Sequence, residues 1–172
     1  MSELLTDIVP PIGRVTLNRP DKRNALNSAM WLDLTHLAVQ LSQDDRLRVV
    51  LLMGAGQEAF SAGADIVEMR QSLADPPKMQ AMQQAVLDAQ VAWERIPIPT
   101  IAMIRGACTG GGCGLALSCD LRIATPDAFF AIPPAKLGLA YSLADTKRLC
   151  DLVGPSRTKE ILYTGRRIDA TE

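Results

Sequence analysis

The sequence has very few aromatic residues and a single histidine. Phe, Trp and Tyr together make up 4% of the 172 residues, whereas hydrophobic residues as a class make up 48%. A folded core must therefore be built mainly from Leu, Val, Ile, Ala and Met. The one histidine, His36, lies beside the apolar stripe of an expected helix, and we assign it no catalytic role.

An excess of charge of either sign is also lacking. Lys and Arg number 18 and Asp and Glu number 19, so the formal net charge is −1. Such a chain has no overall field that attracts nucleic acid or an anionic membrane, and neither is expected as a partner. No apolar run approaches the length of a membrane span, and the N-terminal stretch MSELLTDIVPPIGRV lacks the basic and apolar regions of a signal peptide. A cytoplasmic location is expected.

The cysteines lack the short paired spacing of a zinc site. Cys108, Cys113, Cys119 and Cys150 stand in apolar or helical surroundings, and the single histidine cannot complete a ligand set. We interpret all four as buried reduced thiols. No metal and no disulfide is expected.

The stretch from residue 104 to residue 141 organises the chain. The apolar strand PTIAMIRG is expected to run into three glycines, Gly110 to Gly112, where a helix begins. Successive glycines leave backbone N–H groups unshielded, and a helix N-terminus carries unpaired donors and a partial positive charge. The pattern therefore predicts a site that stabilises an oxygen which becomes negative during a reaction.

A second turn of the same kind lies upstream. The apolar strand VVLLMGAG is followed by FSAGADIVEMR, in which Asp65 is expected to cap a helix. Two strand-to-helix turns of small residues could each supply one N–H to a single carbonyl oxygen. This possibility makes a purely structural role for the glycines less attractive.

The rest of the chain predicts strands and helices in alternation. Strands are expected in IGRVTLNRP, LRIAT and FFAI, and helices after Asn27 or Ser28, from Asp65 to about Leu73, from about Met79 to just before Ile96, and over GPSRTKEILYTGRR up to Gly165. There is no low-complexity segment or domain linker. An α/β domain is predicted.

The two glycine-rich motifs resemble those of the crotonase, or enoyl-CoA hydratase/isomerase, superfamily. F-S-A-G-A-D-I-x-E-M is followed by G-A-x-x-G-G-G-x-x-L-A-L-x-C-D, and the resemblance extends from about Gly13 to Glu172. It implies a crotonase/ClpP-like superhelix of β-β-α units with two roughly perpendicular sheets. In this family a C-terminal helical region follows and mediates trimer formation. Residues 1–172 are expected to be the acyl-CoA-binding core domain without that region, and the full-length protein a homo-oligomer, either a trimer or a dimer of trimers.

The resemblance also implies the ligand. An acyl-CoA thioester is expected as substrate, with coenzyme A as part of the substrate rather than a separate cofactor. The N–H groups of Ala64 and Gly111 are implied to bind the thioester oxygen. The implied coenzyme A contacts are Ala62, Ala64, Asp65 and Ile66 around the adenine and Lys22, Arg23 and Ala25 near the phosphates. For Lys22 and Arg23 a solvated turn is the alternative.

Two departures from the family pattern bear on the reaction. Hydratases of this family carry glutamates just after G-G-G-C and after F-x-x-P, where this chain has Gly114 and Pro134. Neither side chain can transfer a proton, so ordinary hydration should be slow and isomerase, decarboxylase or thioester hydrolase chemistry is favoured. Tyr141, Ser142 and Asp145 are the candidates for a replacement group. Tyr141 stands where methylmalonyl-CoA decarboxylase-like members have a tyrosine.

Alternative interpretations stay open. Tyr141 could serve packing alone, and Asp145 could cap a helix. The chain as a whole could be a non-catalytic acyl-CoA-binding or scaffold member. A nucleotide-binding oxidoreductase is disfavoured, because no G-x-G-x-x-G can be read through Gly110 to Gly114.

Overall fold

The structure, a computed structural model, describes residues 2–172. One sheet contains β1 (Leu4–Val9), β2 (Ile12–Leu17), β3 (Val49–Gly54), β5 (Thr100–Ile104) and β7 (Leu121–Ala124), and the other contains β4 (Ala59–Ser61), β6 (Ala107–Thr109), β8 (Phe129–Ala131) and β9 (Arg167–Asp169). The helices are α1 (Ser28–Gln43), α2 (Ile66–Leu73), α3 (Pro76–Glu94), α4 (Gly111–Leu117) and α5 (Leu143–Thr164). Short 3-10 turns occupy Pro20–Lys22 and Pro134–Leu137.

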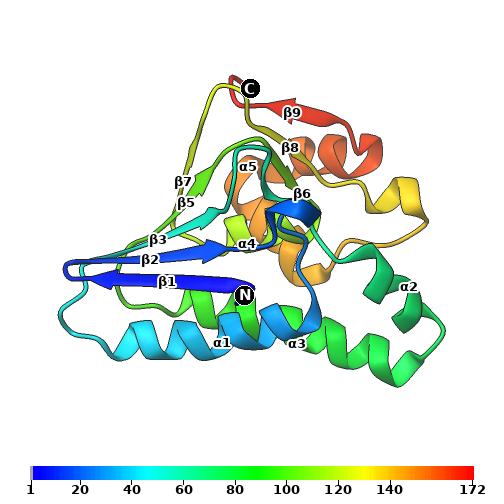
Figure 1. Cartoon of the computed structure of the whole chain (residues 1–172). Helices are drawn as coiled ribbons and strands as arrows, with labels where there is room; N and C mark the ends of the chain where they lie inside the picture. Colours follow the sequence, from blue (N-terminus) through cyan, green and yellow to red (C-terminus); the bar gives the residue numbers. More distant parts are fainter. Residues whose placement is uncertain (1) are drawn as a thin grey trace.

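A β-β-α unit repeats along the chain. In β3-β4-α2, β5-β6-α4 and β7-β8-α5, the first strand joins the five-stranded sheet and the second joins the four-stranded sheet (Figure 1). Within each sheet these strands are parallel, whereas β1 and β9 pair antiparallel at the edges. The predicted α/β fold with two sheets and β-β-α units is confirmed.

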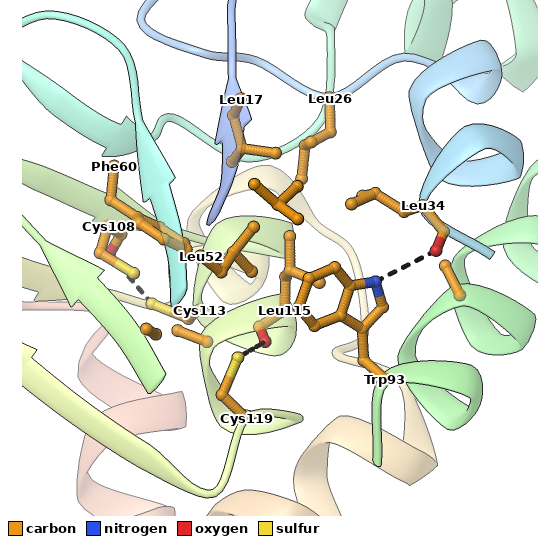
Figure 2. Packing of buried hydrophobic residues seen from close by; sticks show 14 of the residues in the cluster. Leu17, Leu26, Leu34, Leu52, Phe60, Trp93, Cys108, Cys113, Leu115 and Cys119 are labelled. Atoms are coloured by element: carbon orange, nitrogen blue, oxygen red, sulfur yellow. Dashed lines mark hydrogen bonds between the residues drawn. The ribbon is translucent and has the colours of Figure 1, made fainter. Parts of the chain in front are cut away.

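The main core lies between the five-stranded sheet and the helices α1 and α3, which run side by side (Figure 1). Met30, Leu34 and Leu41 from α1 and Ala89 and Trp93 from α3 are buried, as the helical spacing predicts. The indole Nε1 of Trp93 donates a hydrogen bond of 3.2 Å to the Leu34 carbonyl oxygen (Figure 2). This bond satisfies the one polar atom of a fully buried side chain.

The short helix α4 lies in the interior, and cysteines pack around it. Cys108, Cys113 and Cys119 are buried, and the Cys113 thiol donates to the Cys108 carbonyl oxygen at 2.9 Å (Figure 2). Burial raises the pKa of Cys119 to about 12, so this thiol stays protonated. The prediction of buried thiols is right for these three and wrong for Cys150, which is partly exposed.

The structure corrects several expected boundaries. The strand expected to run into the glycines is two strands, because β5 ends at Ile104 and the chain turns at Gly106 into β6 of the other sheet. The strand β1 was not predicted. The last helix begins at Leu143, well before the predicted segment, and is interrupted at Gly154, whose φ is 77°.

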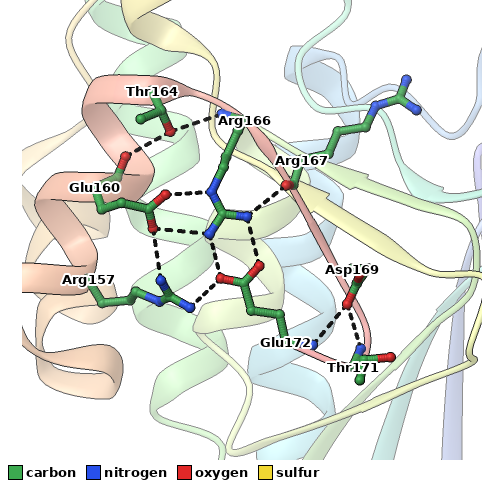
Figure 3. Close-up of polar contacts among 8 residues, drawn as sticks. All are labelled: Arg157, Glu160, Thr164, Arg166, Arg167, Asp169, Thr171 and Glu172. Atoms are coloured by element: carbon green, nitrogen blue, oxygen red, sulfur yellow. Dashed lines mark hydrogen bonds and ion pairs between the residues drawn. The ribbon is translucent and has the colours of Figure 1, made fainter.

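An ion-pair cluster joins the end of the chain to α5 (Figure 3). Glu160 accepts from Arg157 at 3.3 Å and from Arg166 at 2.5 Å, and Glu172 pairs with both arginines. Exposed pairs contribute little one at a time, about 0–1 kcal/mol each, but shared partners reduce the entropy lost per pair. The cluster therefore helps to hold β9 beside β8.

Within the described residues, no helix has both the length and the apolar character that crossing a membrane requires.

Gly106→Ala should be strongly destabilising. An added Cβ would lie 2.1 Å from the Glu58 carbonyl oxygen, and the φ of +60° is already unfavourable for alanine. Gly138 has a φ of +68° with no atom within 4 Å of such a Cβ, so Gly138→Ala isolates the backbone strain of about 1–2 kcal/mol. We expect Gly106→Ala to lower the free energy of unfolding in urea by about 1–3 kcal/mol more. Equal losses would contradict the close-approach explanation.

Candidate active site

Three turns meet at one edge of the four-stranded sheet. The strands β4, β6 and β8 are adjacent and parallel, so their carboxyl ends lie at the same edge. The turn after β6 is bonded to both neighbours, because Gly110 N–H donates to the Ala131 carbonyl oxygen at 2.9 Å and Thr109 Oγ1 donates to the Ala62 carbonyl oxygen at 2.8 Å. The fold thus brings together turns that are far apart in sequence.

Two backbone N–H groups lie on adjoining turns. A Cβ built on Gly111 would lie 3.8 Å from the Ala64 nitrogen, and one built on Gly63 would lie 3.3 Å from the Gly111 nitrogen. Within residues 2–172, neither the Ala64 nor the Gly111 N–H donates to a protein acceptor. Gly111 is the first residue of α4, where no intrahelical acceptor exists. The two predicted donors are therefore close together and both are free.

Asp65 holds the turn that carries Ala64. Its Oδ1 accepts from the N–H groups of Val67 and Glu68 at the start of α2, as predicted for a cap, and its Oδ2 accepts from Arg19 at 2.8 Å. Burial favours the neutral carboxyl group, but these hydrogen bonds outweigh it and keep the pKa of Asp65 below its ordinary value. The side chain of Asp65 is thus a charged structural support.

The residues predicted to contact coenzyme A share one surface. The loop of Lys22, Arg23 and Ala25 is bonded to the β4 turn, since the Ala62 N–H donates to the Arg23 carbonyl oxygen at 2.9 Å. Lys22 and Arg23 are exposed, and Arg23 pairs with the exposed Glu58 at 3.4 Å. Ile66 is 59% exposed at the start of α2. Lys22 Nζ lies 3.9 Å from Asp65 Oδ2, so this loop adjoins the turn that carries Ala64, as binding of one ligand by both would require.

Gly114 is enclosed by side chains from two other helices. A Cβ at this position would lie 2.5 Å from Gln90 Nε2 of α3 and 2.7 Å from Asp145 Oδ1 of α5. No side chain fits there unless these groups move. The packing requirement explains why glycine stands at this position, and it was not visible in the sequence. Pro134 begins a 3-10 turn and carries no titratable group.

Tyr141 and Asp145 lie beside the same turn. The Tyr141 hydroxyl donates to the Gly110 carbonyl oxygen at 3.4 Å, and burial together with the nearby Asp145 raises the pKa of Tyr141 well above its ordinary value. Burial also raises the pKa of Asp145. Hydrogen bonds from Ser142 and Arg148 lower this pKa, but they offset the effect of burial only in part. Ser142, not Asp145, is the N-cap residue of α5, so the alternative interpretation of Asp145 as the cap is wrong.

Sequence reasoning missed Gln90 and Arg148. Gln90 is 1% exposed, and its Oε1 accepts from Arg148 Nη1 at 2.9 Å. Its Nε2 is the one buried side-chain nitrogen or oxygen that lacks a hydrogen-bond partner in residues 2–172. A polar residue three positions before the buried Trp93, on the face of α3 that packs inward, was the signal that could have identified it.

Two cavities adjoin this region. A groove of about 1040 Å³ lies between α3 and the start of α5, and Gln90, Tyr141 and Ser142 line it. A smaller cavity of about 420 Å³, with more apolar walls, lies between α4, α5 and β9 and includes none of the predicted site residues. No group of three His, Cys, Asp or Glu in the described part of the chain could hold a metal ion.

The match with known proteins decides the family. Residues 8–172 match the family model described as enoyl-CoA hydratase/isomerase. This chain belongs to that family. The resemblance inferred from the two glycine-rich motifs is confirmed, and members of the family are enzymes.

The relatives named here carry different reactions in their names. The short-chain-enoyl-CoA hydratase of Clostridium acetobutylicum is 36% identical over 160 residues, covering 92% of this chain and 60% of the relative. The mitochondrial Delta(3,5)-Delta(2,4)-dienoyl-CoA isomerase of Rattus norvegicus is 35% identical over 175 residues, covering 92% of this chain and 51% of the relative.

A solved structure shows the same fold. The enoyl-CoA hydratase/carnithine racemase of Magnetospirillum magneticum superposes with a TM-score of 0.95 at 36% identity, covering 99% of this chain and 64% of that one. This chain therefore spans between about half and two thirds of the length of the proteins it matches. Family membership alone leaves the reaction open, because the relatives are named for both hydration and isomerisation.

Asp65→Ala should destabilise the fold at neutral pH. The change leaves α2 without its side-chain cap and removes one of the two carboxylates that pair with the buried Arg19, which keeps Glu3 at 3.0 Å and the Ala25 carbonyl oxygen at 2.7 Å, so we expect a loss of about 3 kcal/mol. Because the folded state lowers the pKa of Asp65, this contribution is present above the unfolded pKa of about 3.9 and is lost as pH falls through the folded pKa.

Urea unfolding of parent and variant at neutral and acid pH measures this effect. Asp7→Ala, which breaks an exposed pair with Arg14, is the control and should cost less than about 1 kcal/mol. A loss for Asp65→Ala that is as small as the control, or that does not shrink in acid, would contradict the assignment.

Proposed function

We propose that this chain binds an acyl-CoA thioester and stabilises its enolate between the N–H groups of Ala64 and Gly111. The observation that carries the proposal is that the two donors lie on adjoining turns and neither has a protein acceptor in residues 2–172. When the α-carbon of a thioester loses a proton or a carboxyl group, negative charge moves to the thioester oxygen. Two fixed N–H donors stabilise that charge, and the loss of one typically costs about 2.7–4 kcal/mol.

Coenzyme A enters this proposal as part of the substrate. The exposed Lys22 and Arg23 can give charge-assisted hydrogen bonds to its phosphates. The backbone around Ala62 and Ile66, beside the free Ala64 N–H, supports an adenine contact at the same surface. A cytoplasmic homo-oligomer stays a prediction.

Hydration is the less favoured reaction. It requires a group that positions water and relays its proton, and Gly114 and Pro134 carry none. Isomerisation and decarboxylation pass through an enolate, and thioester hydrolysis passes through a tetrahedral oxyanion; the same two donors can stabilise either one without those two glutamates. The alternative, a binding protein without turnover, is supported by the same N–H pair, because these donors serve binding and catalysis alike.

Gly111→Pro tests the N–H pair. It removes one N–H at the first position of a helix, where proline is tolerated. Calorimetry should show binding of a CoA analogue bearing a nitronate, which mimics the enolate oxygen, weakened by about 10²-fold or more, and binding of a simple acyl-CoA weakened far less.

Gly111→Ala is the matched control for this experiment. It keeps the N–H, and its methyl group would make ordinary contacts at 3.5 Å with Trp31 and 3.8 Å with the Ala64 nitrogen. Both ligands should bind this variant nearly as they bind the parent. Equal losses for the two ligands in Gly111→Pro would count against an oxyanion role.

Crotonyl-CoA hydration by the parent should be slow, since general acid–base catalysis is typically worth about 10²–10⁴-fold. Introducing Gly114→Glu and Pro134→Glu together should not restore it, because Gln90 and Asp145 occupy the space at residue 114. The measurement is the loss of the conjugated thioester absorbance. Rapid hydration by the parent would overturn this assignment.

A further inference from the structure

We propose that Asp145 and Ser142 form a proton relay that opens onto the groove between α3 and α5 and delivers a proton to the enolate. The inference rests on the proposed function, because it assumes that an acyl-CoA enolate forms at Ala64 and Gly111. It assigns a role to a buried carboxyl group in a chain where residues 114 and 134 carry no group for proton transfer.

The contact between the two residues carries the inference. Asp145 is 4% exposed, whereas Ser142 is exposed and lines the groove. Ser142 Oγ donates to Asp145 Oδ2 at 2.8 Å and accepts from the Asp145 N–H at 3.0 Å. The serine hydroxyl therefore connects a buried carboxyl group to the groove.

The hydrogen-bonding capacity of a hydroxyl group makes this contact a switch. A serine hydroxyl has one proton to donate and two lone pairs that accept. With Asp145 ionised, the Ser142 proton points at the carboxylate. With Asp145 protonated, the carboxyl O–H and the Asp145 N–H occupy both lone pairs, and the Ser142 proton is free to point into the groove.

The surroundings keep the protonation of Asp145 adjustable. Arg148 Nη1 lies 3.2 Å from Asp145 Oδ1, and this arginine also pairs with Glu94 of α3 at 3.0 Å. Tyr141 is a titratable group nearby, the Gln90 amide faces the carboxyl group from α3, and Gly114 of α4 lies against it. Burial raises the pKa of Asp145, while Arg148 limits the rise.

Tyr141 connects the groove to the turn that carries Gly111. Tyr141 lines the groove, and its hydroxyl reaches the carbonyl oxygen of Gly110, the residue before Gly111. The relay requires that a thioester whose oxygen lies between Ala64 and Gly111 places its α-carbon on the groove side of Tyr141, beside Ser142. Met82, Val86 and Leu87 give the groove apolar walls suited to an acyl chain.

The step balances without a further reactant. Protonated Asp145 transfers its proton to Ser142 Oγ while the Ser142 proton bonds to the enolate α-carbon. The electron pair of the new C–H bond comes from the enolate, the thioester carbonyl re-forms, and Asp145 becomes a carboxylate. The reverse passage removes an α-proton, so the relay also exchanges the α-hydrogens of a thioester with solvent.

The test is exchange of the α-hydrogens of butyryl-CoA in D₂O, followed by proton NMR across pH. In the parent, the rate should rise with pH and level off once Asp145 is ionised, since the carboxylate accepts the proton. Asp145→Asn and Ser142→Gly should each slow exchange by about 10²–10⁴-fold and abolish that rise, with butyryl-CoA affinity within a few-fold of the parent. Glycine is a good N-cap residue, so Ser142→Gly keeps the helix start if Asp145→Asn folds poorly.

Two further variants separate a relay from a structural role. Arg148→Gln removes the cation beside Asp145 and should move the midpoint of the pH profile upward. Asp151→Asn, on the exposed side of α5, should leave rate and midpoint unchanged. Failure of the parent to bind butyryl-CoA would overturn the proposed function and this inference with it. A parent that binds and exchanges, with Ser142→Gly and Asp145→Asn exchanging equally fast, would overturn the relay alone.

Discussion

The parallel alignment of three short strands, β4, β6 and β8, is the constraint on which the site depends. Each strand has three residues, so few of the bonds that hold the site are ladder bonds. The turns after the strands are instead joined to one another, as in the Gly110 N–H bond to Ala131 and the Thr109 bond to Ala62. Several donors of these turns are used in this way, whereas the N–H groups of Ala64 and Gly111 have no protein acceptor among the described residues and are candidates for binding a ligand.

Side chains from two other helices limit the space at Gly114. A side chain there would collide with Gln90 and Asp145, so a glutamate at residue 114 and a carboxyl group in the position of Asp145 exclude each other in this packing. At this place the chain has a carboxyl group on α5 and none on α4, together with a buried amide whose Nε2 has no partner among the described residues.

Sequence patterns predicted what depends on local chemistry. The cap at Asp65, the start of α4 at Gly111 and the apolar stripes of α1 and α3 follow from spacing and residue type, and the structure has all of them. Contacts between distant segments were not predictable in this way. The division of one apolar run into β5 and β6 depends on the other sheet, and the role of Gln90 depends on Arg148, which lies 58 residues further on. A single sequence contains no direct signal for such pairs.

Burial disfavours the ionised form of Asp145 in the folded state. Its folded pKa is raised above the unfolded value, so the folded state binds the proton more tightly and its stability falls as pH rises through that range. Asp65, by contrast, gains stability on ionisation because Arg19 and two backbone N–H groups bond to its carboxylate. The folded state thus lowers the pKa of Asp65 and raises the pKa of Asp145. Asp145, whose charged form is disfavoured, is the one that Ser142 links to a groove. A carboxyl group in such an environment is expected where it transfers protons rather than stabilises the fold.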